Sequence, residues 1–210
     1  MSDLPLSGLD KVNILVIGDV MLDRYISGSI TRVSPEAPVP VLLQTDENVA
    51  LGGAGNVVAN LASLGANVKF ISAVGADPAA GNVKSALENL IGANVKSYLI
   101  EDKTRPTTEK TRLVSGSQQI VRLDRENTDL VSSEVEDKII KTFDEAIGHS
   151  DLLVISDYAK GLLTDKILRH CIEKAVSIPV IVDGKGNSFT KYKGANYITP
   201  NREEVTKVTG

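Results

Sequence analysis

The chain has 210 residues, of which 42% are hydrophobic and 24% are charged, and its formal net charge is -4. This composition is typical of a globular protein with one large domain, or with a core and a small appendage. The acidic balance argues against a nucleic-acid-binding protein, and neither an apolar run of ~20 residues nor an N-terminal signal pattern is present, which predicts a cytoplasmic protein without a membrane segment.

Strands and helices alternate along most of the sequence. The nearly continuous apolar runs at 12–19 and 151–156 are typical of strands buried on both faces. Further strands are predicted at 68–74, 178–182 and 196–199, and helices at 55–64, 78–91 and 167–175. This alternation predicts an α/β protein with a mostly parallel sheet covered by helices on both sides.

Two segments interrupt this alternation. Residues 39–45 are extended and flanked by proline, and residues 107–124 have the pattern of a hairpin with a Ser-Gly-Ser turn. Together with residues 95–100 they predict a small β-sheet outside the main body, formed by lid segments at about 22–50 and 95–125. Such a sheet could act as a lid, as a dimer surface, or as both.

A glycine cluster at 52–55 leads directly into the helix predicted at 55–64. Gly52 and Gly53 have no Cβ, so a ligand can approach the backbone closely, and the helix start offers free N–H groups. Asn56 can both donate and accept hydrogen bonds. These features predict a binding site for a polar small molecule that carries hydroxyl or phosphate groups.

Charged and amide side chains follow four of the predicted strands, at the sheet edge where ligands bind in open α/β folds. They are Asp23, Asp157, Lys160, Asp183, Lys185, Asn201, Arg202, Glu203 and Glu204. Lysines suit phosphate and carboxylates suit sugar hydroxyls or Mg²⁺, and Lys110 and Arg112 are further phosphate candidates by charge and position. For each acid or amide taken singly, capping of the next helix is an equally good interpretation.

Two other phosphate-binding patterns are disfavoured. The sequence has no G-x-x-x-x-G-K-[ST] segment, which excludes a P-loop. The Gly53-x-Gly55 pair lacks the third glycine of the dinucleotide fingerprint, and the next strand ends without an acid at the ribose position, which argues against a dehydrogenase.

Several of these motifs together resemble the ribokinase-type (PfkB-type) carbohydrate kinases. The resemblance rests on Gly52-Gly53-x-x-Asn56, Leu61 to Gly65, Gly75-Ala-Asp77 with Gly81, Gly18 with Asp23, and Asn201-x-x-Glu204. It covers about Val12 to Gly210. Within the family, segments 18–25, 34–41, 156–161 and 199–201 are similar to the members that phosphorylate D-glycero-D-manno-heptose 7-phosphate at its anomeric hydroxyl, for ADP-heptose and lipopolysaccharide core synthesis.

The resemblance implies a three-layer α/β/α ribokinase-like core with a β-sheet lid, and ATP and Mg²⁺ as cofactors. Asp23, Gly52, Gly53 and Asn56 would hold the sugar. Asn201 to Glu204 would line the nucleotide, with Glu204 organising Mg²⁺, and Asp183 is a further candidate there. It also implies a homodimer formed through the lid and a possible fused adenylyltransferase domain.

The family's Gly-Ala-Gly-Asp segment, whose aspartate is the catalytic base, is not found in these 210 residues. We therefore expect that aspartate beyond Gly210, the C-terminal part of the fold to be missing, and a chain that binds substrate with little or no turnover. Two alternatives remain open: another sugar or sugar-phosphate kinase of this family, and a non-catalytic sugar-phosphate-binding or dimerisation module.

Overall fold

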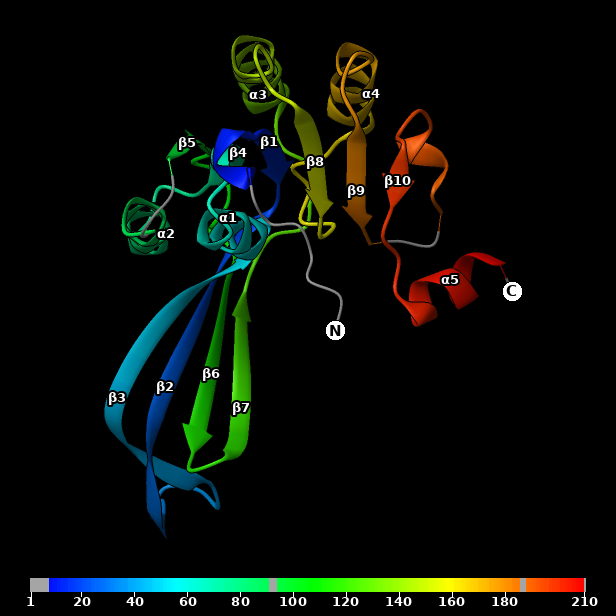
Figure 1. The fold of residues 1–210 in the computed structure, drawn as a ribbon. Coiled ribbons are helices and arrows are strands. Elements are labelled where there is room, and N and C mark those ends of the chain that lie inside the picture. The colour runs from blue at the N-terminus through cyan, green and yellow to red at the C-terminus, as the bar shows by residue number, and fades with distance from the viewer. Residues whose placement is uncertain (1–7, 91–93, 186–187, 210) are drawn as a thin grey trace, which may run out of the picture.

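A computed structural model of the chain describes residues 8–90, 94–185 and 188–209. Figure 1 shows a main body, in which helices lie on both sides of a sheet, and a second sheet that projects from it. The second sheet is called the lid here.

The main sheet has six strands in the order β10-β9-β8-β1-β4-β5, and every neighbouring pair is parallel. The strands are β1 (Asn13–Gly18), β4 (Asn67–Val74), β5 (Val95–Glu101), β8 (Leu152–Asp157), β9 (Val180–Gly184) and β10 (Tyr197–Ile198). Because parallel strands all end on the same edge, the polar residues that follow β1, β8, β9 and β10 emerge on one side of the body.

Successive side chains of β1 point to opposite faces of the main sheet and contribute to two hydrophobic cores, one on each face. Leu15 and Ile17 pack with α3 and α4, whereas Ile14 and Val16 pack with α1 and α2. The helices are α1 (Ala54–Ser63), α2 (Pro78–Glu88), α3 (Ser133–Ala146), α4 (Asp165–Lys174) and α5 (Arg202–Thr209), with single 3₁₀ turns η1 (Leu9–Lys11) and η2 (Thr190–Tyr192). The predicted three-layer α/β/α core with its mostly parallel sheet is confirmed.

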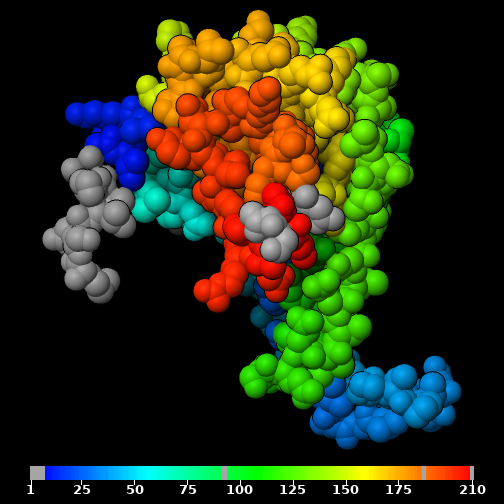
Figure 2. All heavy atoms as spheres, turned by 90° about the vertical axis from the view of Figure 1, so that its right-hand side faces the viewer, coloured from blue at the N-terminus to red at the C-terminus, as the bar shows by residue number. Residues whose placement is uncertain are grey.

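The lid has four strands in the order β3-β2-β6-β7. They are β2 (Val20–Val33), β3 (Pro40–Gly53), β6 (Glu109–Ser115) and β7 (Gln118–Arg125). The β2–β3 and β6–β7 pairs are antiparallel and the β2–β6 pair is parallel, so the predicted hairpin at 107–124 is confirmed. In Figures 1 and 2 the far end of the β2–β3 hairpin extends well away from the main body.

Residues 95–100 were predicted as part of the lid, and this prediction is wrong. They form β5, which pairs in parallel with β4 at the edge of the main sheet. The physical reason is a crossover: a strand that follows a strand and a helix returns to the same sheet. Leu99 and Ile100 accordingly pack on the two different cores of the main body.

Two smaller observations concern the helices. The helix predicted at 78–91 begins at Pro78, where the Asp77 carboxylate accepts the Ala80 N–H at 3.1 Å and caps α2, but it ends at Glu88 and not near residue 91, which lies outside the described residues. Among the described residues no helix has both the length and the apolar character needed to cross a bilayer.

Cys171 is fully buried, as expected of a core residue, and burial raises the pKa of its thiol.

Candidate functional site

A cavity of about 610 Å³ opens where the lid joins the carboxyl edge of the main sheet. All predicted substrate-binding residues except Asp157 line it, namely Asp23, Gly52, Gly53, Asn56, Lys110, Arg112, Lys160 and Lys185. The lining comes from the lid, from the glycine turn before α1 and from the segments that follow β8 and β9. Five lysine or arginine side chains and one carboxylate face this space, in a chain whose net charge is -4.

The glycine turn is packed closely, so that a side chain at Gly52 or Gly53 would displace neighbouring atoms. A Cβ on Gly52 would lie 2.4 Å from the Asp23 carboxylate, and a Cβ on Gly53 would lie 2.5 Å from the Asp19 carbonyl oxygen. Gly53 also has a φ of 57°, which disfavours other residues. Asn56 is exposed in the first turn of α1 and lines the cavity.

On the lid side, the register between β2 and β6 places acids and bases next to one another. Asp23 lies opposite Lys110, and Tyr25 lies opposite Arg112. The Arg112 guanidinium donates to the Asp23 carboxylate at 2.6 Å and stacks over the Tyr25 ring at 5.2 Å. The bond to Asp23 raises the pKa of Arg112, so this guanidinium stays charged.

Glu126 joins two of the cavity lysines. Its carboxylate accepts from Lys160 Nζ at 2.8 Å and from Lys110 Nζ at 3.3 Å, so one carboxylate bridges the main body and the lid. Lys160, followed by Lys110, holds the pKa of Glu126 below its usual range. A group with two anionic oxygens therefore fits between these ammonium groups, as a phosphate would.

A second group of charges lies at the ends of β9 and β10. Lys185 Nζ stands 4.4 Å from the centre of the Tyr158 ring. Burial and the neighbouring Glu204 raise the pKa of Asp183, although Lys185 and Thr199 act in the opposite sense. A carboxylate whose charge is disfavoured by a neighbouring carboxylate is suited to a cation, and Mg²⁺ needs only one or two carboxylates when phosphate oxygens complete its shell. The described residues contain no cluster of three acid, histidine or cysteine ligands.

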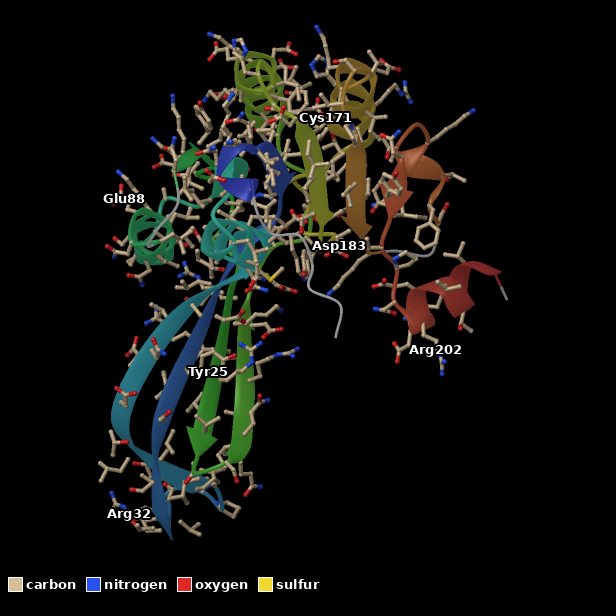
Figure 3. All side chains as sticks on the ribbon, in the orientation of Figure 1. Tyr25, Arg32, Glu88, Cys171, Asp183 and Arg202 are labelled. Carbon is tan, nitrogen blue, oxygen red and sulfur yellow. The ribbon has the colours of Figure 1, made fainter. Side chains whose placement is uncertain are left out.

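The Asn201-x-x-Glu204 motif forms a reciprocal cap at the start of α5. The Asn201 side chain accepts the Glu204 N–H at 3.0 Å, and the Glu204 carboxylate accepts the Asn201 N–H at 2.8 Å. This arrangement is a capping box, so helix capping accounts for the local conformation of both residues. Arg202 and Glu203 are exposed in the first turn of α5, and Figure 3 shows Arg202 on the side away from the main sheet.

Asp157 does not reach the cavity, and its predicted contact with substrate does not fit the structure. It is 2% exposed, and its carboxylate accepts from Tyr192 Oη at 2.7 Å and from Lys191 Nζ at 2.6 Å. Burial and the bond to Asp157 raise the pKa of Tyr192. Asp157 therefore ties β8 to the η2 turn.

Six cavity residues were not among the predicted site residues: Met21, Tyr25, Ala50, Leu51, Arg122 and Tyr158. Arg122 could have been found from the sequence, because alternation in the predicted hairpin places it on the same face as Arg112, which it opposes in the register. Tyr25 is on the same strand as Asp23, two residues later, and Figure 3 shows it on the lid.

Comparison with known proteins places these observations in a family. Residues 11–210 match the model of the pfkB family carbohydrate kinases. The chain belongs to this family. The bifunctional protein HldE of Azorhizobium caulinodans is 47% identical over 199 residues, and that of Geobacter metallireducens is 46% identical over 202 residues. These matches cover 94% and 95% of this pfkB-family chain but only 41% of each relative's length.

Solved structures agree on the fold. Phosphofructokinase-2 from Escherichia coli superimposes with a TM-score of 0.71 at 20% identity, covering 94% of this chain and 64% of that one. Ribokinase of Arabidopsis thaliana, solved with ribose and ATP, superimposes with a TM-score of 0.60 at 16% identity, covering 95% and 63%. The ribokinase-like architecture expected from the sequence is therefore confirmed.

Proposed function

We propose that this chain is the sugar-phosphate-binding part of a kinase that phosphorylates D-glycero-D-manno-heptose 7-phosphate at its anomeric hydroxyl, with ATP and Mg²⁺, for ADP-heptose and lipopolysaccharide core synthesis. The observation that carries the proposal is the composition of the cavity, in which one carboxylate and one amide face five cations. The similarity to HldE proteins and the heptose-kinase-like segments at 18–25 and 156–161 favour this sugar over others.

The roles proposed for the residues follow from their chemistry. Asp23, Asn56 and the backbone of Gly52 and Gly53, which line the cavity, are proposed to bind sugar hydroxyls, because carboxylate, amide and peptide groups can each bond a hydroxyl. Lys110 and Lys160, which share a carboxylate in the structure, are proposed to share the substrate phosphate, with Arg112 and Lys185 adding positive potential.

On the nucleotide side we propose Asp183, Asn201, Arg202, Glu203 and Glu204 as contacts, with Glu204 as the magnesium ligand. Bound Mg²⁺ would neutralise charge on the transferring phosphoryl group. The chain's own residues bind and orient the sugar so that its anomeric hydroxyl faces that group. We also propose a cytoplasmic homodimer that contacts its partner through the lid, and a fused adenylyltransferase domain in the natural protein, as the bifunctional relatives favour.

The test is isothermal titration of this chain with heptose 7-phosphate, fructose 6-phosphate and ribose, with ATP turnover followed in parallel. Selective binding of heptose 7-phosphate supports the proposal, and the turnover assay tests the expectation that these 210 residues bind without phosphorylating. Tighter binding of fructose 6-phosphate would identify a different sugar-phosphate kinase. A folded sample that binds none of the three would contradict the proposal. Lys160→Ala should weaken binding, whereas Lys166→Ala, which removes a lysine paired with Asp137 on the outer surface, should not.

A further inference from the structure

The turn that follows β8 brings two residues of the cavity into place. Tyr158 and Lys160 both line the cavity and both belong to this turn, residues 158–162. Its backbone has an unfavourable shape: Ala159, a residue with a Cβ, has a φ of 54°, and Gly161 has a φ of 88°. Left-handed conformations cost energy for residues other than glycine, so a turn of this shape requires support from its surroundings.

Asp19 supplies that support from one side. Its carboxylate is 3% exposed and accepts three backbone N–H groups of the turn. The distances are 2.9 Å from Tyr158, 3.1 Å from Lys160 and 3.3 Å from Leu162. Asp19 is the single residue between β1 and β2. Its hydrogen bonds therefore fix the backbone of the turn relative to the main sheet, through β1, and relative to the lid, through β2.

Arg105 supplies support from the other side. Its guanidinium donates to the carbonyl oxygen of Lys160 at 2.8 Å and to that of Asp129 at 2.5 Å. Its Nε donates to the Asp102 carboxylate at 3.1 Å, and this pair is almost fully buried, with side chains 9% and 2% exposed. The N–H of Lys160 is thus held by a carboxylate, and its carbonyl oxygen is held by a guanidinium that is itself fixed.

We propose that Asp19 and Arg105 are positioning residues for substrate recognition, which hold the backbone of Lys160 on both sides so that its ammonium group meets the phosphate of the sugar. The proposal rests on the proposed function, since it assigns Lys160 to the phosphate. A fixed backbone reduces the entropy that Lys160 loses on binding, so preorganisation increases affinity without adding a contact. Neither residue lines the cavity.

A double-mutant cycle separates positioning from general stabilisation. Asp19→Asn keeps the shape of the side chain but replaces one carboxylate oxygen by an NH₂ group. This group is a donor and cannot accept a backbone N–H, so the turn is displaced. We expect Asp19→Asn to weaken heptose 7-phosphate binding about tenfold in the wild type and less than about twofold when Lys160 is already alanine, because coupled residues are not additive. The matched control is Asp151→Asn, whose carboxylate accepts the Asn13 N–H at 2.8 Å before β8 and should leave binding unchanged.

Arg105→Lys provides a second cycle and replaces the first if Asp19→Asn does not fold. It keeps a cation beside Asp102 but cannot hold two carbonyl groups in a planar fork. Amide hydrogen exchange at Tyr158, Lys160 and Leu162 should be slow in the wild type and at least about tenfold faster in either variant. Equal fold-losses of affinity with and without Lys160, or unchanged exchange, would overturn the inference while the proposed function stands. A wild-type chain that binds no sugar phosphate would instead overturn the proposed function.

Discussion

The carboxylate of Asp23 and the guanidinium of Arg112 meet at 2.6 Å inside the cavity, although 89 positions separate them in the chain. In the parallel β2–β6 pair Asp23 lies opposite Lys110, and Arg112 is two residues beyond Lys110 on the same strand. Residues two apart on a strand share one face of the sheet, so the register of the lid brings the two side chains together. Each group therefore satisfies the other before any sugar arrives. A ligand with hydroxyl and phosphate groups can engage both at once, whereas a neutral sugar offers Arg112 hydroxyl acceptors but no negative charge.

Asp23→Asn should weaken binding of heptose 7-phosphate by about 10- to 100-fold, because a hydrogen bond to a charged group contributes about 1.5–3 kcal/mol. Titration calorimetry measures the loss. Asp46→Asn, at an exposed position on β3, serves as the control and should bind like the wild type. Unchanged affinity in Asp23→Asn would remove this residue from the proposed sugar site.

Gly52→Ala should abolish sugar binding while the fold persists. The new methyl group would lie 2.4 Å from the Asp23 carboxylate and would force this side chain out of position. Gly81→Ala makes the matched control, because a Cβ at this position in α2 meets nothing within 4 Å. That control should stabilise the chain by about 0.5–1 kcal/mol and leave binding intact, as thermal melts and titrations would show. Normal binding by Gly52→Ala would contradict the role given to the glycine turn.

Glu126→Gln should strengthen sugar-phosphate binding severalfold, because Lys110 and Lys160 would no longer be neutralised by a carboxylate. A weaker or equal affinity for heptose 7-phosphate would show that Glu126 does not compete with the phosphate. Glu134→Gln is the control, since Glu134 pairs with Lys138 along the exposed face of α3.

The lowered pKa of Glu126 predicts a pH dependence of the free energy of unfolding, which Glu126→Gln can test. Lys160 and Lys110 lower the pKa of Glu126 below its ordinary value of 4.5, so its ionised form stabilises the folded chain above that pH. This stability is lost as the pH falls through the folded-state pKa. The difference in unfolding free energy between wild type and Glu126→Gln should therefore shrink below about pH 4.5, as urea titrations at several pH values would measure. A difference that grows on acidification would contradict the sign of this effect.

Glu204→Gln tests whether the start of α5 serves more than capping. Glutamine keeps an oxygen for the Asn201 N–H, so the cap survives while the charge is lost. If Glu204 binds Mg²⁺, the affinity for Mg²⁺-ATP should fall about tenfold, because a neutral amide is a weaker ligand for a hard cation. Asn201→Ala is the complementary variant and should cost about 1 kcal/mol of helix stability. Equal Mg²⁺-ATP affinity in wild type and Glu204→Gln would leave capping as the role of the motif.

Exposed apolar side chains lie on the face of the lid that is turned away from the cavity, and they are candidates for the contact between two copies of the chain. Val121 and Leu123 alternate with the cavity-facing Arg122 and are 50% and 63% exposed. If the lid forms the homodimer contact, Leu123→Asp should convert a dimer to a monomer in sedimentation or light-scattering measurements. Val176→Asp, at an exposed valine just after α4, should not. A wild type that is monomeric at all concentrations would contradict the dimer.

The sequence was most informative where one residue pattern matched one physical requirement. The apolar run at 12–19 is typical of a strand buried on both faces and forms β1, and the helix predicted from residue 78 begins at Pro78. The edge strand β5 was misassigned because its mixed residues also suit a solvated lid. The contacts of Glu126 depend on where β7 ends relative to the turn after β8, which no local pattern encodes.

Two aspartates show the limit of reading function from strand ends. Gly18 and Ser156 are register partners, so Asp19 and Asp157 occupy equivalent positions on neighbouring strands. Both are buried, and neither lines the cavity. Burial raises the pKa of Asp19, with Asp157 adding to the effect and the N–H donors opposing it. The sequence places both carboxylates at the right edge, but it does not say that Asp19 holds the turn after β8 or that Asp157 ties β8 to the η2 turn.

The single-residue link between β1 and β2 has a consequence for engineering. At this end of the lid, β3 also continues directly into α1. The β1–β2 and β3–α1 connections therefore contain no loop that could accept an insertion. The opposite end differs: residues 35–38, between β2 and β3, form exposed bends, and Figure 2 shows this end of the hairpin well away from the main body. A fluorophore or a peptide tag introduced there would report on the lid without disturbing its root.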